Sequence, residues 1–355
     1  MEQELEGALR CPLMSIVVVN YNGGERLVSC LESLIVDRDP NREILVVDND
    51  SRDDSRTILH GVAALHPEIS VLWSERNLGY AGAVNLALER ARGEFIGVLN
   101  MDMTVTPGWA SSPLAFLREH PNVGAVNPLI VLLDGKRVNA TGQDVHITGL
   151  GFNRGLGQPV ELVGRAPFRV SGIQGGAFIT RRALLQRIGG MDTAGFLYHE
   201  DVNLSWLLQL MGFELYCVPE GVVSHDYVLS MYPEKLYLLE RNRWAMLMAY
   251  VHCSSLVLLS PILLLTECLV WGYCIWRGWA FVRGKVASYR WVFRRWPQIK
   301  SRRRFAESVR VESDWRILKG LSWGYTLGQV VTLGRERGDS PRQPVGGIPK
   351  EAIDD

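Results

Sequence analysis

The chain has 355 residues, enough for one large domain or two ordinary ones, and its 38 basic residues balance its 38 acidic residues. A net charge of zero gives no overall field that would favour nucleic acid as a partner. The six cysteines are scattered with no C-x-x-C pair, which argues against a disulfide framework and against a cysteine zinc site. Residues 1–10 are polar and acidic, so we expect no secretory signal and a cytosolic catalytic part.

The first half of the sequence alternates short apolar runs with amphipathic stretches. These predict strands at 16–19, 44–47, 70–74 and 95–100, each followed by a helix, at 26–36, 55–66, 83–92 and 107–120. This βαβα order predicts a mostly parallel, doubly wound sheet. A strand at 124–131, a hairpin about Asp134-Gly135 and a mobile glycine-rich loop at 149–165 are expected next.

The second half resumes with predicted strands at 175–180 and 214–218 and predicted helices at 181–188, 202–211 and 235–250. Residues 251–276 are then almost wholly apolar, interrupted by Pro261 and Glu267. Ten Lys or Arg residues follow between Cys268 and Ala306 with no Asp or Glu among them. Residues 334–355 are rich in Gly, Pro and charge, which predicts a disordered tail.

Polar side chains stand at the ends of three apolar strands, in MSIVVVNYN, EILVVDNDS and EFIGVLNMDM. Ligands of open α/β sheets bind outside the carboxyl ends of the strands, where such side chains converge. Asp48 can contact a base or ribose, or it can be a helix N-cap or form an Asx-turn. Asn100 and Asp102 can hold a divalent cation, although turns often contain such residues. The pattern predicts a site for a nucleotide and a metal ion.

Two further candidates follow later in the chain. Glu200-Asp201 opens a predicted helix, where acids are also common because they favour the helix dipole. His225 is a single histidine, and such residues are usually structural. The order and spacing of these residues together, rather than any one of them, favour a functional site.

With these motifs the chain resembles the family 2 glycosyltransferases, in particular the rhamnosyltransferase-like branch that builds bacterial cell-surface polysaccharides. The resemblance covers about residues 14–244. The matching text is VVNYNG, VVDNDSRDDS, ERNLGYAGAVNLAL, GVLNMDM, GGAFITRRALLQRIGGMD, FLYHEDVNLSW and GFELYCVPEGVVSH.

The resemblance implies a GT-A fold, a mixed α/β sheet, with a nucleotide-diphosphate sugar as donor, Mg²⁺ or Mn²⁺ as cofactor and inverting chemistry. It implies that Asp102 and His225 bind the metal and that Asp201, beside Glu200, is the general base. It assigns to the donor the residues Asn20, Asn22, Asp48, Asn49, Asn77, Gly79, Asn85, Asn100 and Asp102.

The sequence departs from the family pattern at three positions. Asn100 replaces the first acid of the D-x-D motif, Asn203 replaces the third acid of E-D-x-D, and Leu207 stands where an Arg is usual. Asp102 is therefore the one acidic metal ligand expected at this motif. The last two changes concern the surroundings of the acceptor rather than Asp201 itself.

Residues 251–276 are long enough for a transmembrane helix, but Pro261 and Glu267 favour equally a helical hairpin in the membrane interface. The Trp-rich basic stretch that follows is typical of an anchor on anionic lipid, so we expect residues 251–304 to contact a membrane. The alternatives are a buried helical core with a solvated basic face and, less favoured, an RNA-binding patch. Arg241-Asn242-Arg243-Trp244 either contacts an acceptor diphosphate or is ordinary helix surface.

We therefore expect a terminal extension at 1–12, a GT-A catalytic domain at 13–230, a helical membrane-associating region at 231–320 and a tail at 321–355. The predicted enzyme is a metal-dependent inverting glycosyltransferase at the cytoplasmic face of the cell membrane. It would move a sugar, rhamnose first, to a saccharide or lipid-linked saccharide acceptor. The alternatives are a galactosyl or N-acetylglucosaminyl transferase, a nucleotidyltransferase, and a non-catalytic assembly partner.

Overall fold

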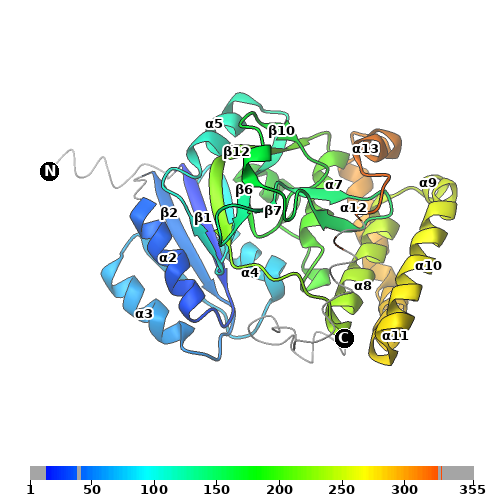
Figure 1. Cartoon of the computed structure of the whole chain (residues 1–355), viewed down its shortest axis with the longest axis horizontal. Coiled ribbons are helices and arrows are strands. Elements are labelled where there is room, and N and C mark those ends of the chain that lie inside the picture. Colours follow the sequence, from blue (N-terminus) through cyan, green and yellow to red (C-terminus); the bar gives the residue numbers. More distant parts are fainter. Residues whose placement is uncertain (1–12, 38–40, 327–328, 330–355) are drawn as a thin grey trace.

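The computed structural model describes residues 13–37, 41–326 and 329, and its centre is a mixed ten-stranded sheet (Figure 1). The main strands lie in the order β10-β12-β6-β11-β4-β1-β2-β3. Four neighbours are parallel, as the βαβα pattern predicts: β3 (Ile69–Trp73), β2 (Arg42–Asp48), β1 (Met14–Asn20) and β4 (Phe95–Asn100). The strand order reverses between β1 and β4, which is where an open α/β sheet binds its ligand.

The other half of the sheet is mixed. β11 (Ala177–Arg181) is antiparallel to both β4 and β6 (Val123–Leu132), while β12 (Glu214–His225) runs parallel to β6. Short strands extend it, namely β5 (Met103–Val105) and β10 (Phe168–Arg169) on β12 and β7 (Val138–Ala140) on β6. β8 (Gln143–Val145) and β9 (Gly151–Asn153) form a separate hairpin.

Helices cover both faces of the sheet because alternate residues of its central strands point to opposite sides. Met14, Ile16 and Val18 of β1 pack against one set of helices: α2 (Glu25–Asp37), α3 (Ser55–Leu65) and α5 (Ser111–Glu119). Val17 and Val19 belong to the opposite core, with α4 (Gly79–Leu88), α6 (Arg182–Arg187) and α7 (Glu200–Leu210).

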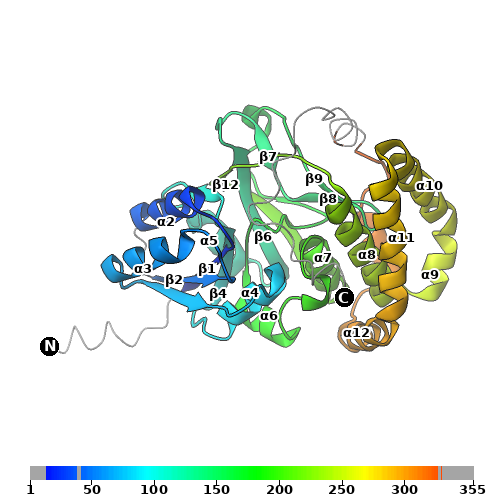
Figure 2. The same cartoon turned by 90° about the horizontal axis from the view of Figure 1, so that it is seen from below.

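Within the described residues, six helices follow the sheet: α8 (Pro233–Tyr250), α9 (Cys253–Leu258), α10 (Ser260–Arg277), α11 (Trp279–Arg294), α12 (Trp296–Val309) and α13 (Asp314–Gly320). In both views α10 and α11 form the outermost layer, on the side of the molecule away from α2 and α3 (Figures 1 and 2). The core that contains Val17 also contains Leu247 of α8 and Ile317 of α13. One hydrophobic core therefore crosses the domain boundary expected at 230/231.

Two expected segments differ in the structure. The 149–165 loop contains β9 and a short 3₁₀ helix (Val160–Leu162). Residues 321–326 of the expected tail pack on the catalytic part. The backbone N–H of Ser322 donates to Val145 O at 2.8 Å, and the Ser322 carbonyl accepts from Ile147 N at 3.0 Å. The expected extension at 1–12 and residues 327–328 and 330–355 lie outside the described residues.

Strand β12 is seven residues longer than the predicted 214–218 strand. Pro219 led us to expect that the strand ends there. It lies instead where the pairing register with β6 shifts, between Val218 and Val222, so the lack of a proline N–H donor is tolerated. As a consequence His225 is the last residue of a strand and pairs with Met103.

The apolar stretch 251–276 is divided between α9 and α10, which meet at Leu259 beside Pro261. Among residues 13–37, 41–326 and 329, no helix is both long and apolar enough to cross a bilayer. A helical hairpin does form, but it consists of α10 and α11 joined at Gly278, whose φ of 107° suits glycine.

Candidate active site

A cavity of about 660 Å³ lies where the carboxyl ends of β4 and β12 face the start of α7. The predicted site residues that line it are Asn49, Asn77, Gly79, Asn100, Asp102, Glu200, Asp201 and His225. Four other predicted residues do not line it: Asn20, Asn22, Asp48 and Asn85. The fold thus brings both predicted acids and the predicted metal pair to a single cavity.

Asn20 and Asp48 lie at neighbouring strand ends and are fully buried. Asn20 Nδ2 donates to Asp48 Oδ1 at 3.0 Å, and the other carboxylate oxygen accepts from Ser51 N at 3.3 Å and Arg56 Nε at 3.1 Å. Asn22 accepts from Arg52 N at 2.6 Å. Asp48 thus makes structural contacts that stabilise the two loops behind the cavity. Its local bond, to Ser51 N three residues on, is neither an Asx-turn nor the N-cap of α3, which is Asp54.

Asn49 connects the loop after β2 to the start of α4. Its Nδ2 donates to Asn77 Oδ1 at 2.9 Å and to Gly79 O at 3.2 Å, and its Oδ1 accepts from Leu78 N at 2.8 Å. Asn77 Oδ1 also accepts from Gly79 N at 2.9 Å, so α4 begins at Gly79 rather than at the predicted residue 83. Asn85 instead bonds both backbone groups of Met191, each at 2.8 Å.

Asp102 and His225 meet at the predicted metal position, with His225 Nε2 3.5 Å from Asp102 Oδ1. His225 Nδ1 is 2.9 Å from Asn139 Oδ1, an acceptor only, so in the neutral imidazole Nδ1 carries the proton and the lone pair of Nε2 faces Asp102. Among the described residues, the buried Asp102 Oδ1 has no hydrogen-bond partner. This pair has the chemistry of two ligands of a divalent cation.

The pair is not a complete metal site. Within the part of the chain that the structure describes, no group of three or more His, Cys, Asp or Glu side chains could hold a metal ion. A cation bound here would need oxygen ligands from a substrate or from water, as Mg²⁺ commonly does.

Asp201 is held by three N–H donors. Gln143 Nε2 at 2.7 Å and Gly175 N at 3.0 Å donate to Oδ2, and Val202 N at 2.8 Å donates to Oδ1. Burial raises the pKa of Asp201, while these donors oppose the shift. Glu200 beside it has a buried Oε2, and burial followed by the charge of Asp201 raises the pKa of Glu200 to about 8.

Two glycines join the metal side of the cavity to the acid side. Asn100 N donates to Gly176 O at 2.8 Å, and Gly175 N donates to Asp201. A side chain at Gly175 would place its Cβ 3.1 Å from Asp201 Cβ, a tight contact, so glycine favours the close approach of this segment to α7.

Sequence reasoning missed three residues of this site, namely Asn139, Gln143 and Gly175. Asn139 and Gln143 lie in the short strands β7 and β8, where a single polar residue carries no periodic signal. Gly175 falls within a matching motif, but its bond to Asp201 joins residues 26 positions apart. Only the folded arrangement shows these roles.

We expect Glu200→Gln to stabilise the protein at high pH and to change nothing at low pH. A carboxyl whose folded pKa is raised stabilises below its unfolded pKa and loses that contribution as pH rises through the folded value. The variant should therefore melt about a few degrees higher than wild type near pH 9, and equally near pH 4, below the ordinary pKa of a glutamate. Thermal unfolding at both pH values checks this, and parallel pH profiles would contradict the burial of a neutral Glu200.

Comparison with known proteins is consistent with this geometry. Residues 15–189 match the model of the family described as glycosyl transferase family 2. A curated relative from Mycobacterium tuberculosis, N-acetylglucosaminyl-diphospho-decaprenol L-rhamnosyltransferase, is 27% identical over 236 residues, which cover 60% of this chain and 76% of the relative.

Two solved structures share the fold. The mannosyltransferase PcManGT from Pyrobaculum calidifontis, solved with GDP-Man and Mn²⁺, aligns over 93% of this chain and 89% of its own, with a TM-score of 0.50 and 16% identity. GalNAc-T7, solved with UDP, GalNAc and Mn²⁺, aligns over 67% of this chain and 48% of its own, with a TM-score of 0.53 and 18% identity. At these identities the likeness establishes the mixed α/β glycosyltransferase fold.

Proposed function

The chain belongs to glycosyl transferase family 2, and on that premise we propose that it is an inverting, metal-dependent transferase that moves a sugar from a nucleotide diphosphate to a lipid-linked saccharide. The observation that carries the proposal is the single cavity lined by both Asp102 with His225 and Glu200 with Asp201. PcManGT was solved with the nucleotide sugar GDP-Man and GalNAc-T7 with UDP and GalNAc, which supports a nucleotide-sugar donor here.

In this proposal Asp201 accepts the proton of the acceptor hydroxyl as that oxygen attacks the anomeric carbon from the face opposite the leaving diphosphate. Its three N–H donors fix the orientation of the carboxylate, and a base so positioned contributes roughly 10²–10⁴-fold to the rate. Asn49, Asn77 and Gly79 form the wall on the nucleotide side.

Asp102 and His225 would hold Mg²⁺ or Mn²⁺, which when bound would act as a Lewis acid on the leaving diphosphate. Asn139 fixes the tautomer of His225 that leaves Nε2 free to coordinate. Among the described residues Asp102 Oδ1 accepts no hydrogen bond, which supports this role because a buried carboxylate oxygen rarely lacks one.

The acceptor end of the cavity supports a lipid-linked substrate. The wall contributed by α8 and α10 includes the apolar residues Leu236, Leu239, Leu269 and Val270 beside the charged residues Lys235, Glu240 and Arg243. Leu269 lines the cavity and is also 48% exposed. A saccharide on a lipid carrier would thus reach Asp201 from an apolar helix surface. The relative from M. tuberculosis is named for such an acceptor.

We place this surface against the cytoplasmic face of the cell membrane. The apolar face of α9 to α11 consists of the exposed residues Val257, Leu258, Leu264, Leu265, Leu269, Ile275, Trp276 and Trp279. Exposed cations on α11 and α12 lie next to it in the sequence: Arg283, Arg290, Arg294, Lys300 and Arg304. Aromatic and aliphatic side chains with flanking cations are what binds an anionic lipid interface.

Two members of the basic stretch have internal roles instead. Lys285 is fully buried in an ion cluster, and Arg302 pairs with Asp192 and donates to Asn203 Oδ1 at 2.9 Å. The alternative of a solvated basic face therefore fails for these two residues.

We expect the double variant Leu265→Glu/Ile275→Glu to lose vesicle binding by roughly tenfold or more, because fully burying each aliphatic side chain is worth about 1.5–3 kcal/mol. Flotation with vesicles containing anionic lipid at physiological salt measures this. Leu65→Glu is the matched control, since Leu65 at the end of α3 is 77% exposed and lies away from α10. If both variants float equally, this face does not bind the vesicles. If wild type does not float either, the proposed membrane binding is wrong.

A screen of nucleotide sugars by thermal shift with Mn²⁺ tests the function itself. A thymidine-diphosphate donor of rhamnose is our first choice, ahead of uridine-diphosphate donors of galactose or N-acetylglucosamine. One sugar should raise the melting temperature above its bare nucleotide and support transfer. If no nucleotide sugar does either, a non-catalytic partner of an assembly complex becomes the better interpretation.

A further inference from the structure

The acids of the cavity follow a backbone segment in an unfavourable conformation. We call residues 195–199, between β11 and α7, the acid-presenting loop. Three of its non-glycine residues have positive φ: Phe196 at 62°, Tyr198 at 66° and His199 at 71°. Such conformations persist only where the surroundings impose them, and they cluster at functional sites. Glu200 and Asp201 come directly after this loop.

Two side chains of α8, the amide of Asn242 and the guanidinium of Arg241, face most of the loop's carbonyls. Asn242 Nδ2 lies 3.0 Å from Gly195 O, 3.1 Å from Leu197 O and 2.8 Å from Tyr198 O. Arg241 Nη2 also donates to Gly195 O, at 3.2 Å. The carbonyl of Phe196 instead accepts a hydrogen bond from Tyr80 N at 2.9 Å, from the side of the cavity proposed to bind the nucleotide. Asn242 is therefore the main polar support of the loop on the side of α8.

A second contact from α8 reaches the same loop through a turn. Arg243 Nη1 donates to Thr148 O at 3.1 Å, and the next residue, Gly149, offers its carbonyl to His199 Nε2 at 2.7 Å. His199, Asn242 and Arg243 are 6%, 7% and 1% exposed. The sequence alternative of ordinary helix surface is therefore wrong for Asn242 and Arg243.

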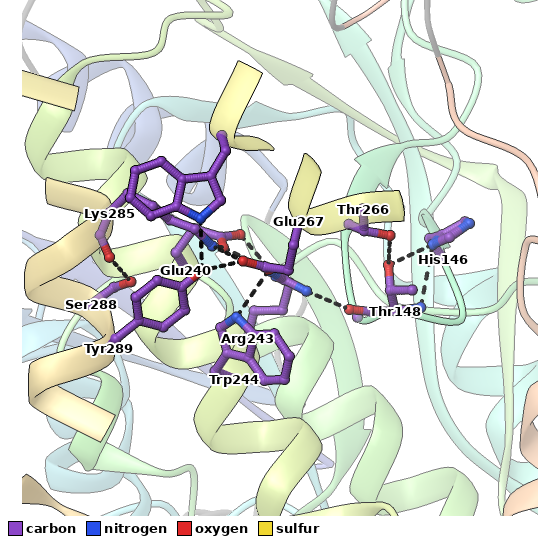
Figure 3. Close-up of polar contacts among 12 residues, drawn as sticks. His146, Thr148, Glu240, Arg243, Trp244, Thr266, Glu267, Lys285, Ser288 and Tyr289 are labelled. Atoms are coloured by element: carbon purple, nitrogen blue, oxygen red, sulfur yellow. Dashed lines mark hydrogen bonds and ion pairs between the residues drawn. The ribbon is translucent and has the colours of Figure 1, made fainter. Parts of the chain in front are cut away.

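α8 itself is anchored by a buried ion cluster that joins it to α10 and α11 (Figure 3). Arg243 donates to Glu240 Oε1 at 2.8 Å and pairs with Glu267, while Lys285 pairs with both acids. Burial by itself raises the pKa of Glu240, but the neighbouring cations Arg243 and Lys285 lower this pKa to about 2. The cluster therefore holds two positive and two negative charges that balance. Rotation of α8 would break this cluster, so the helix presents Asn242 from a rigid base.

We propose that Asn242 is a positioning residue that holds the acid-presenting loop in its left-handed conformation, so that Asp201 faces the acceptor hydroxyl. This role rests on the proposed function, because it assigns Asp201 as the base. The helical region after residue 230 is then part of the catalytic framework. The ion cluster fixes α8 against α10 and α11, and Asn242 of α8 in turn contacts the loop that precedes Glu200 and Asp201.

The test compares Asn242→Asp with Asn242→Ala in the full-length protein. The aspartate keeps the shape but replaces the donor with a charge that faces three carbonyls, and the alanine removes the contact. Both should lower kcat roughly 10²-fold, the effect of misplacing a catalytic group by about 1 Å, while nucleotide affinity measured by calorimetry stays within about twofold of wild type.

Gly195→Ala is an independent variant on the loop side. A Cβ at Gly195 would lie 3.0 Å from Asn242 Nδ2 and would push the amide away, so kcat should fall in the same direction. Thr180→Val is the control, because it also removes a buried donor to a backbone carbonyl, Gly124 O at 2.7 Å, on a strand that does not contact the loop. It should leave kcat unchanged.

Two readouts separate positioning from general destabilisation. In Asn242→Ala the loop opens to water, so the pKa of Asp201, raised by burial, should move toward its ordinary value and the acidic limb of the kcat profile should move to lower pH. Amide hydrogen exchange over residues 195–203 should become faster while that of β1 and β4 does not change.

Wild-type kcat and wild-type exchange in both Asn242 variants would overturn the inference. So would a parallel loss of nucleotide affinity and activity, because it would mean that the fold as a whole had suffered. If instead wild type transfers no sugar from any donor, the proposed function fails, and the exchange measurement still decides whether Asn242 holds the loop.

Discussion

Asp201→Asn should lose turnover by roughly 10²–10⁴-fold while it binds the nucleotide donor as wild type does. The amide has the size of the carboxylate but cannot accept the proton of the acceptor hydroxyl. Gln143 Nε2 and Gly175 N donate to the Asp201 carboxylate, so the substitution changes local hydrogen bonds as well as the charge. Nucleotide affinity must therefore be measured by calorimetry alongside kcat.

The matched control for this variant is Asp144→Asn. Asp144 precedes Val145 in β8, next to Gln143, but it is not part of the cavity wall. It should keep wild-type turnover. If Asp201→Asn turned over like wild type, the assignment of the base would be wrong, and Glu200 would be the next acid to test because it lines the same cavity.

Asp102→Ala should abolish the part of donor binding that depends on metal. Among the described residues, Asp102 is the one acid paired with His225, so the variant leaves a single imidazole, too few ligands for a hard cation such as Mg²⁺. We expect calorimetric titration of the donor with Mg²⁺ or Mn²⁺ to show an affinity lower by roughly 10²-fold or more. Changing only a hydrogen-bond partner of a metal ligand already lowers metal affinity by up to about 10²-fold.

Titration in the presence of a chelator is the control for this variant. Without a divalent cation, wild type and Asp102→Ala should bind the nucleotide equally weakly, since only the metal-dependent part differs. Unchanged affinity of the variant with Mn²⁺ would show that Asp102 and His225 do not hold a cation.

Much of the architecture could be predicted from local patterns. The strand ending at Asn100 is found at its predicted residues, and β1, β2 and α3 lie within a few residues of theirs, because a buried parallel strand is a continuous aliphatic run. The errors occur where tertiary contacts override local signals. β12 continues past Pro219 through a register shift, and α10 ends in a hairpin with α11 at Gly278.

The same division holds for the site. The sequence by itself determined which acids and amides exist and at which strand ends they lie, since Asp102, Glu200 and Asp201 stand in motifs with a recognisable order. Only the tertiary structure decided which of them share a cavity. Asp48 makes structural hydrogen bonds outside it, while Asn139, Gln143 and Asn242 become partners of the functional groups. The physical reason is that hydrogen bonds between residues far apart in the chain depend on how the strands and helices pack, and no periodic pattern records that packing.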